Sequence, residues 1–254
     1  MPSDPAALAW AFGWGLVAGS GVLAGALLAL VADLPHRAIA ATMSLGAGLV
    51  LAAASVELAA ESLRAAGAGV TAAGIVGGAA VFSLANAVLA MARDRKRCGE
   101  CKAQPSEAEA PGSGLSIALG TALDAVPEAL VLGVVLRSGG PDLALVAAFA
   151  LGNLPEGLSG SAGMRRAGRS RLYVLGLWGG IALGTALATA LAFQLLGGVG
   201  PAWIALLRAF SAGALIALAA ETMIPEAFHD APRYSGVLAA LGFAALLIVG
   251  VAAG

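Results

Sequence analysis

The sequence contains few charged residues, two cysteines and two histidines. Charged residues make up 11 % of the 254 residues, whereas a soluble domain carries about 25 %. The net charge of −1 leaves no basic surface for nucleic acid. Two cysteines are too few for the disulfide framework of a small secreted domain. These shortages exclude a cytosolic enzyme, a nucleic-acid-binding domain and a secreted disulfide scaffold.

Long apolar runs are what the sequence does contain. Hydrophobic residues make up 59 % of the chain, and the mean hydropathy is +0.91. A transmembrane helix needs roughly 20 mostly apolar residues. We predict eight such spans, at about 6–32, 38–63, 70–92, 114–136, 143–164, 172–196, 202–228 and 234–253. The sequence therefore predicts an all-α polytopic membrane helix bundle, a single transmembrane domain over 1–254 in the cell (inner) membrane.

The basic residues predict the orientation of this bundle. Eleven of the fourteen Lys and Arg residues lie in loops after odd-numbered spans, and only Arg64 and Arg137 lie in loops after even-numbered ones. Cytoplasmic loops carry the excess of Lys and Arg, so we expect both termini to be extracytoplasmic. The first residues, Met-Pro-Ser-Asp, lack the positive charge that opens a signal peptide, and none is predicted.

Acidic residues occur inside the predicted spans, where they are costly. Seven of the fifteen lie there: Glu57, Glu61, Asp124, Glu128, Glu156, Glu221 and Glu226. A charge at the bilayer centre costs about 2.5–3.5 kcal/mol on insertion scales. The spans contain one cation, Arg208, as a candidate counter-ion. Either several of these carboxyls are protonated or a cation from outside neutralises them, and both cases indicate cation binding or proton movement.

The spacing of these residues groups them on helix faces. Residues three or four apart lie on one face of a helix. This spacing pairs Glu57 with Glu61, Asp124 with Glu128, and Asn153 with Glu156. Each pair can hold one metal ion from two points on a single helix.

A proline precedes the glutamate in three of the spans, at Pro127, Pro155 and Pro225. Proline removes a backbone donor and frees the carbonyl four residues earlier. A freed carbonyl inside a membrane needs a partner, which a cation or water in a polar cavity can supply. Interrupted helices with carboxylates at mid-depth are typical of transporters.

The second and seventh spans also resemble each other. An offset of 165 aligns Gly48 with Gly213 and Glu61 with Glu226, together with three alanine pairs. Because these spans would cross in opposite directions, we predict a 3+2+3 inverted repeat around the fourth and fifth spans. Inverted repeats place the substrate site at their interface, near the midplane.

At the fourth and fifth spans the sequence resembles the ZIP family of divalent metal transporters. Asn153-Leu-Pro-Glu-Gly157 and Pro127-Glu128 carry the resemblance, which extends through the eight-helix plan to nearly the whole chain. It implies import of a divalent metal (Zn, Mn, Fe or Cd) by alternating access, with no enzymatic activity and no bound cofactor. The implied site is lined by Asp124, Glu128 and Glu156, with Asn153 beside it. The spans that carry Glu57, Glu61, Glu221 and Glu226 would close it.

The sequence departs from the family pattern at three positions and in one span. Asp124 stands where the family usually has histidine, Ala125 replaces asparagine, and Gly152 replaces a common donor. The sixth span carries no carboxylate. We therefore expect one main site, rich in oxygen donors and without histidine. Oxygen donors suit Mg, Ca or Mn, so Mn²⁺ and Fe²⁺ stand beside Zn²⁺ as candidate cargo.

Cys98 and Cys101 lie in the predicted flexible cytoplasmic loop at 93–113. They supply half of the four ligands of a closed zinc site. Two readings stay open: a metal sensor or relay, and a pair of inert thiols.

Other functions remain open at this point. A proton-coupled carrier, or an exporter of another cargo, would have the same fold. A membrane-embedded lipid phosphatase is disfavoured because phosphoryl chemistry needs Arg, Ser and His donors beside the acids. The expected partners are the metal substrate and the lipid bilayer, without nucleic acid. Small-residue surfaces are compatible with a homodimer.

Overall fold

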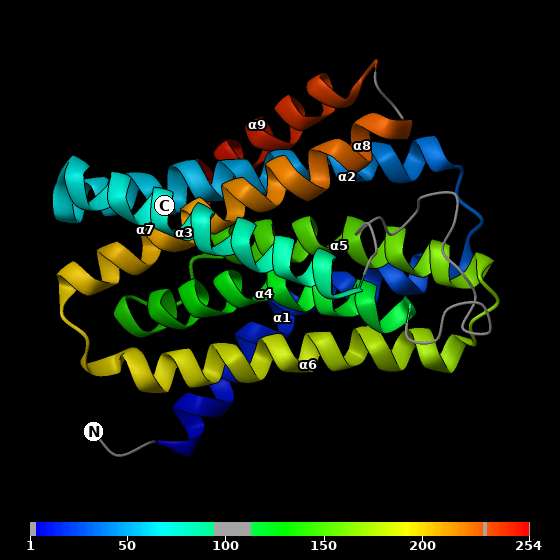
Figure 1. The fold of residues 1–254 in the computed structure, drawn as a ribbon. Helices are drawn as coiled ribbons and strands as arrows, with labels where there is room; N and C mark the ends of the chain where they lie inside the picture. Colours follow the sequence, from blue (N-terminus) through cyan, green and yellow to red (C-terminus); the bar gives the residue numbers. More distant parts are fainter. Residues whose placement is uncertain (1–3, 94–112, 231–232, 254) are drawn as a thin grey trace.

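The computed structural model describes residues 4–93, 113–230 and 233–253, and these ranges form a bundle of long helices without a strand (Figure 1). The elements in order are α1 (Pro5–Val31), α2 (His36–Ala52), η1 (Ala53–Ala59), α3 (Ala60–Arg93), α4 (Ser113–Ser138), α5 (Leu143–Arg166), α6 (Arg171–Leu195), η2 (Leu196–Gly198), α7 (Pro201–Leu218), η3 (Ala219–Met223), α8 (Ile224–Asp230) and α9 (Ser235–Ala253). The predicted all-α fold is confirmed.

Seven helical stretches are long and apolar enough to cross a membrane. One of them, His36–Leu89, has 54 residues, far more than the roughly 20 that one crossing needs. Gly67 lies inside it with φ 77° and ψ 173°, a backbone conformation that glycine adopts readily. The chain reverses direction there, so that α2 and α3 run in opposite directions (Figure 1). The hydroxyls of Ser62 and Thr71 hydrogen-bond at 3.0 Å across this reversal. The fold is thus that of a multi-pass helical membrane bundle.

The helices pack in two groups of four. One group contains α1, α4, α5 and α6, and the other contains α2, α3, α7 and α9. The groups meet where α5 packs against α2 and where α4 packs against α7. Residues on the inner faces of α4 and α5 therefore lie between the two groups.

Local sequence explains where several helices begin. The side chain of Asp4 accepts a hydrogen bond from Ala6 N at 3.0 Å, and Pro5 occupies the first turn of α1. Asp142 caps α5 in the same way by accepting from Leu145 N at 3.0 Å. Such caps satisfy backbone N–H groups that have no partner within the helix.

Two glycines allow α2 and α9 to touch backbone to backbone. A Cβ added at Gly48 would lie 1.9 Å from the carbonyl oxygen of Ala239. One added at Gly242 would lie 2.1 Å from the carbonyl oxygen of Leu45. Any side chain at either glycine would force the two helices apart.

The crossing of α3 and α7 has the same construction. A Cβ at Gly213 would lie 1.9 Å from the carbonyl oxygen of Ile75, and one at Gly78 would lie 1.8 Å from that of Phe210. Each of these four residues stands 164 or 165 positions from its counterpart in the crossing of α2 and α9. The same packing motif is therefore used twice in the bundle.

Both ends of the described chain lie at one end of the bundle (Figure 1). At the opposite end, Arg165 forms an ion pair with Asp33, and Arg166 Nη1 lies 3.5 Å from His36 Nε2. These contacts join the turn between α1 and α2 to the end of α5. The predicted loop with Cys98 and Cys101 lies outside the described residues.

Candidate ion-binding site

The residues at the centre of the prediction are buried between α4 and α5. Their exposed fractions are 2 % for Asp124, 1 % for Glu128, 4 % for Asn153 and 9 % for Glu156. Both helices continue through their internal prolines, Pro127 and Pro155. Ionisable side chains buried at this depth in a membrane bundle are costly unless they have polar or charged partners.

Glu128 and Asn153 are in direct contact. The Asn153 amide donates from Nδ2 to Glu128 Oε2 at 2.7 Å and so links α5 to α4. This length is typical of a hydrogen bond to a charged acceptor. Because an amide presents either NH₂ or a carbonyl oxygen after a half-turn of its terminal bond, Asn153 can also direct an oxygen toward the same point.

Close packing of α1 fixes the stretch of α5 that carries Asn153. A Cβ at Gly21 would lie 1.9 Å from the carbonyl oxygen of Ala150, and one at Gly25 would lie 2.1 Å from that of Leu154. These glycines let α1 lie directly on the α5 backbone. The position of Asn153 relative to α4 is thereby set by main-chain contact, which leaves little freedom to shift.

The opposite side of this α5 stretch packs on α2 and η3. A Cβ at Gly46 would lie 2.8 Å from Cγ of Pro155 and 3.1 Å from Cε of Met223. The proline ring therefore fills the space that Gly46 leaves open. The Pro-Glu segment of α5 lies at the boundary between the two helix groups.

Glu226 of α8 lies against α5. The Ser159 hydroxyl donates a hydrogen bond to Glu226 Oε1, and Ser159 itself is buried. Ser159 follows Glu156 by three residues, hence on the same face of α5. Sequence reasoning did not include Ser159, although this spacing was available to find it.

Glu221 lies in the π-helical segment η3 and contacts α3. It accepts hydrogen bonds from the Ser83 hydroxyl and from Asn86 Nδ2, the latter at 3.0 Å. Asn86 was expected to hydrogen-bond between helices, and this is confirmed. Glu221 is exposed at the bundle surface, in contrast to the buried residues of α4 and α5.

Glu57 lines a polar cavity at the bundle end that holds both chain ends. The cavity has a volume of about 510 Å³, and its other charged lining residues are Asp142 and Arg208. Glu61 lies one turn after Glu57 and forms ion pairs with Arg64 and, at 3.5 Å, with Arg208. Sequence reasoning did not predict the pairing of Glu61 with two arginines.

The eight predicted ligands are thus spread over several places in the described part of the chain. Direct contact joins Glu128 to Asn153, while Glu226, Glu221, Glu57 and Glu61 each have other neighbours. Within residues 4–93, 113–230 and 233–253, no group of three or more His, Cys, Asp or Glu side chains is placed to hold a metal ion. Coordination of an ion by more than two of these carboxylates requires them to move.

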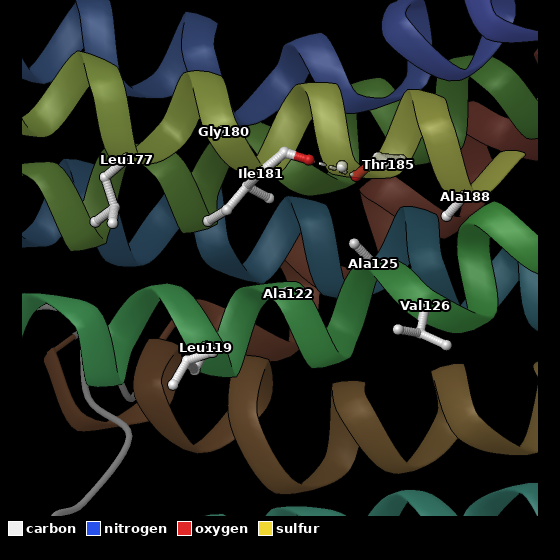
Figure 2. A pocket seen from close by; sticks show the side chains of 10 residues that line it. Leu119, Ala122, Ala125, Val126, Leu177, Gly180, Ile181, Thr185 and Ala188 are labelled. Atoms are coloured by element: carbon white, nitrogen blue, oxygen red, sulfur yellow. Dashed lines mark hydrogen bonds between the residues drawn. The ribbon is translucent and has the colours of Figure 1, made fainter.

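A second cavity lies between α4 and α6 and differs in character. It has a volume of about 380 Å³ and is lined by apolar residues such as Leu119, Leu177 and Ile181 (Figure 2). Its single hydroxyl, on Thr185, donates to the Ile181 carbonyl at 3.0 Å. This cavity offers no ligand for a cation and stands apart from the polar residues.

Comparison with known proteins adds no assignment. No model of a protein family matches the sequence, and no curated protein matches it significantly.

Proposed function

We propose that the protein moves divalent metal cations such as Mn²⁺, Fe²⁺ or Zn²⁺ inward across the inner membrane. Transport proceeds by alternating access through the carboxylate-lined site on α4 and α5. The contact between Glu128 and Asn153 is the observation that carries the proposal. It brings an acid and an oxygen-bearing amide together, buried, on two different spans.

The depth of this pair supports a substrate site. Glu128 lies 15 residues after the start of α4 and 10 before its end, and Asn153 lies 10 and 13 residues from the ends of α5. At 1.5 Å per residue the pair is about 15 to 22 Å from each helix end. That is close to the middle of a hydrocarbon core of about 30 Å.

Polar groups also lie on both sides of this pair along the helix axes. The cavity with Glu57 lies at the end near the turn between α4 and α5. The Ser159–Glu226 contact lies toward the opposite end, near Arg166. A cation can therefore be passed between oxygen donors over most of the bundle length.

An inverted repeat with eight crossings supports the mechanism. Gly67 divides the 54-residue stretch into two spans, and the two glycine crossings repeat at offsets of 164 and 165. The π-helical segments η1 and η3 interrupt α2 and α7 at similar positions, and these helices run in opposite directions (Figure 1). Repeats of this kind exchange conformations between outward-open and inward-open states. With the Arg-rich turns in the cytoplasm, both termini are extracytoplasmic.

The donor set favours hard cations. Glu128, Asn153, Asp124 and Glu156 offer oxygen ligands only, which suit Mn²⁺ better than a site of imidazole or thiolate would. A half-turn of the Asn153 amide replaces its NH₂ with the carbonyl oxygen when a cation arrives. The Glu128–Asn153 contact therefore serves as the resting form of the site.

Uptake of Mn²⁺ into proteoliposomes tests this proposal. We expect Glu128→Gln to abolish uptake because it removes the charge while preserving the shape of the side chain. Ser161→Ala is the matched control, since Ser161 is buried on α5 and its hydroxyl has no hydrogen-bond partner within the described structure. Unchanged uptake by Glu128→Gln would refute the site. Proton movement without metal movement would favour a carrier of another cargo.

A further inference from the structure

Arg208 lies at an unusual place for a basic residue. It is on α7, its side chain is 18 % exposed, and its Nη1 is 3.5 Å from Glu61 Oε2. Its Nε is buried without a hydrogen-bond partner in the part of the chain that the structure describes. The guanidinium therefore uses only part of its hydrogen-bonding capacity in the pair with Glu61.

The same side chain lines the 510 Å³ cavity together with Glu57 and Asp142. Asp142 already accepts a hydrogen bond from Leu145 N as the cap of α5. The Glu57 carboxylate extends toward α9, where a Cβ at Gly250 would lie 3.1 Å from Glu57 Oε1. Glu57 is thus the acid that Arg208 faces in the cavity without also holding a helix cap.

Two other arginines at this end of the bundle are placed differently. The side chain of Arg64 is 68 % exposed and pairs with Glu61 outside the cavity. The guanidinium of Arg137 stacks over the Phe193 ring at 5.1 Å. Of these three arginines, only Arg208 lines the cavity.

We propose that Arg208 is a tethered cation that competes with incoming divalent cations at the outer cavity and so sets their apparent affinity. This inference rests on the proposed function. A fixed positive charge beside Glu57 repels a divalent cation twice as strongly as a monovalent one. Its pair with Glu61 holds the guanidinium at the cavity wall, so that cations can enter beside it. Arg208 therefore acts as a specificity-determining residue at the entrance and is not itself a ligand.

Calorimetric titration with Mn²⁺ in detergent tests the inference without transport. The background is Glu128→Gln with Glu156→Gln, which removes the central carboxylates. In this background we expect Arg208→Gln to tighten Mn²⁺ binding by about fivefold to tenfold, the effect of one charge roughly 8 Å from a divalent ion in a water-like medium. Arg208→Lys retains the charge and should bind as weakly as the parent. Adding Glu57→Gln to Arg208→Gln should abolish the gain.

Arg64→Gln is the matched control. It removes the same charge from the same partner, Glu61, but outside the cavity, and we expect less than a twofold change. An equal gain in Arg64→Gln, or no gain in Arg208→Gln, would overturn the inference. If Arg208→Gln does not fold, Glu61→Gln takes its place. This variant releases the guanidinium toward Glu57 and should weaken Mn²⁺ binding, so unchanged binding there would also overturn the inference.

Transport measurements separate this inference from the proposed function. In proteoliposomes, Arg208→Gln should lower the KM for Mn²⁺ uptake by a similar factor. If the unmodified protein takes up Mn²⁺, Glu128→Gln does not, and Arg208→Gln has an unchanged KM, the inference fails alone. If Glu128→Gln transports normally, the proposed function fails, and the binding titration still decides the role of Arg208.

Discussion

Replacement of Gly48 by alanine tests the packing of the bundle directly. The added Cβ would lie 1.9 Å from the Ala239 carbonyl oxygen and 2.8 Å from Phe243 N. Ordinary van der Waals contact begins at 3.4 Å, so the oxygen is about 1.5 Å too close. Both contacts are with backbone atoms of α9, which have no alternative rotamer. The two helices must therefore separate along their crossing.

Overpacking of this kind typically costs about 1–3 kcal/mol. For a chain of this length each kcal/mol lowers Tm by about 2–4 °C. We expect Gly48→Ala to lower Tm by about 4–8 °C, measured as the loss of the monodisperse peak in size-exclusion chromatography after heating in detergent. Gly213→Ala should cause a similar loss, because its Cβ would lie 1.9 Å from the Ile75 carbonyl oxygen.

Gly176→Ala is the control for these two variants. A Cβ at Gly176 would meet nothing within 4 Å, and alanine is the better helix former by about 0.5–1 kcal/mol. Its Tm should therefore stay the same or rise slightly. If Gly48→Ala and Gly213→Ala were as stable as Gly176→Ala, the backbone contacts between these helices would be wrong, and the structural support for the repeat would be lost.

Two further predictions concern polar contacts between helices. Asn153→Ala removes an oxygen ligand and the hydrogen bond to Glu128, so we expect at least about a tenfold loss of Mn²⁺ uptake efficiency, equivalent to about 1.4 kcal/mol; normal kinetics in proteoliposomes would contradict it. Ser83→Ala removes a hydrogen bond to Glu221 and should lower the stability by about 1–3 kcal/mol, read as a lower Tm in detergent with unchanged Mn²⁺ binding.

The distribution of charge along the sequence predicted several features without any contact information. Glu128 and Asn153 stood out because polar residues in apolar spans are costly and need a reason. The burial of both residues and their contact agree with that reasoning. Glu57 and Glu61 stood out for the same reason, but sequence spacing alone did not separate them from the central residues. Their neighbours are determined by α7 and by the turn before α5, which lie far away in the sequence.

The π-helical segments could not be predicted from the sequence. In η3 the extra backbone length occurs just before Pro225, where a missing N–H already disturbs the hydrogen bonding. In η1 no proline is present, so the local sequence gives no comparable signal. Both segments carry an acidic residue, Glu57 and Glu221. The phase of these side chains around their helices was therefore unknown until the structure placed them.

By itself, the sequence determined that this is an all-helical membrane protein with acids in its spans, because hydropathy and charge act through each residue's own transfer free energy. The tertiary structure decided which acids meet. Gly21 and Gly25 bring α1 onto α5, and this contact sets the position of Asn153 opposite Glu128. Arg208 meets Glu61 across 147 residues of chain. Such pairings depend on close approach between helix backbones, which no local pattern specifies, so only the folded chain could show them.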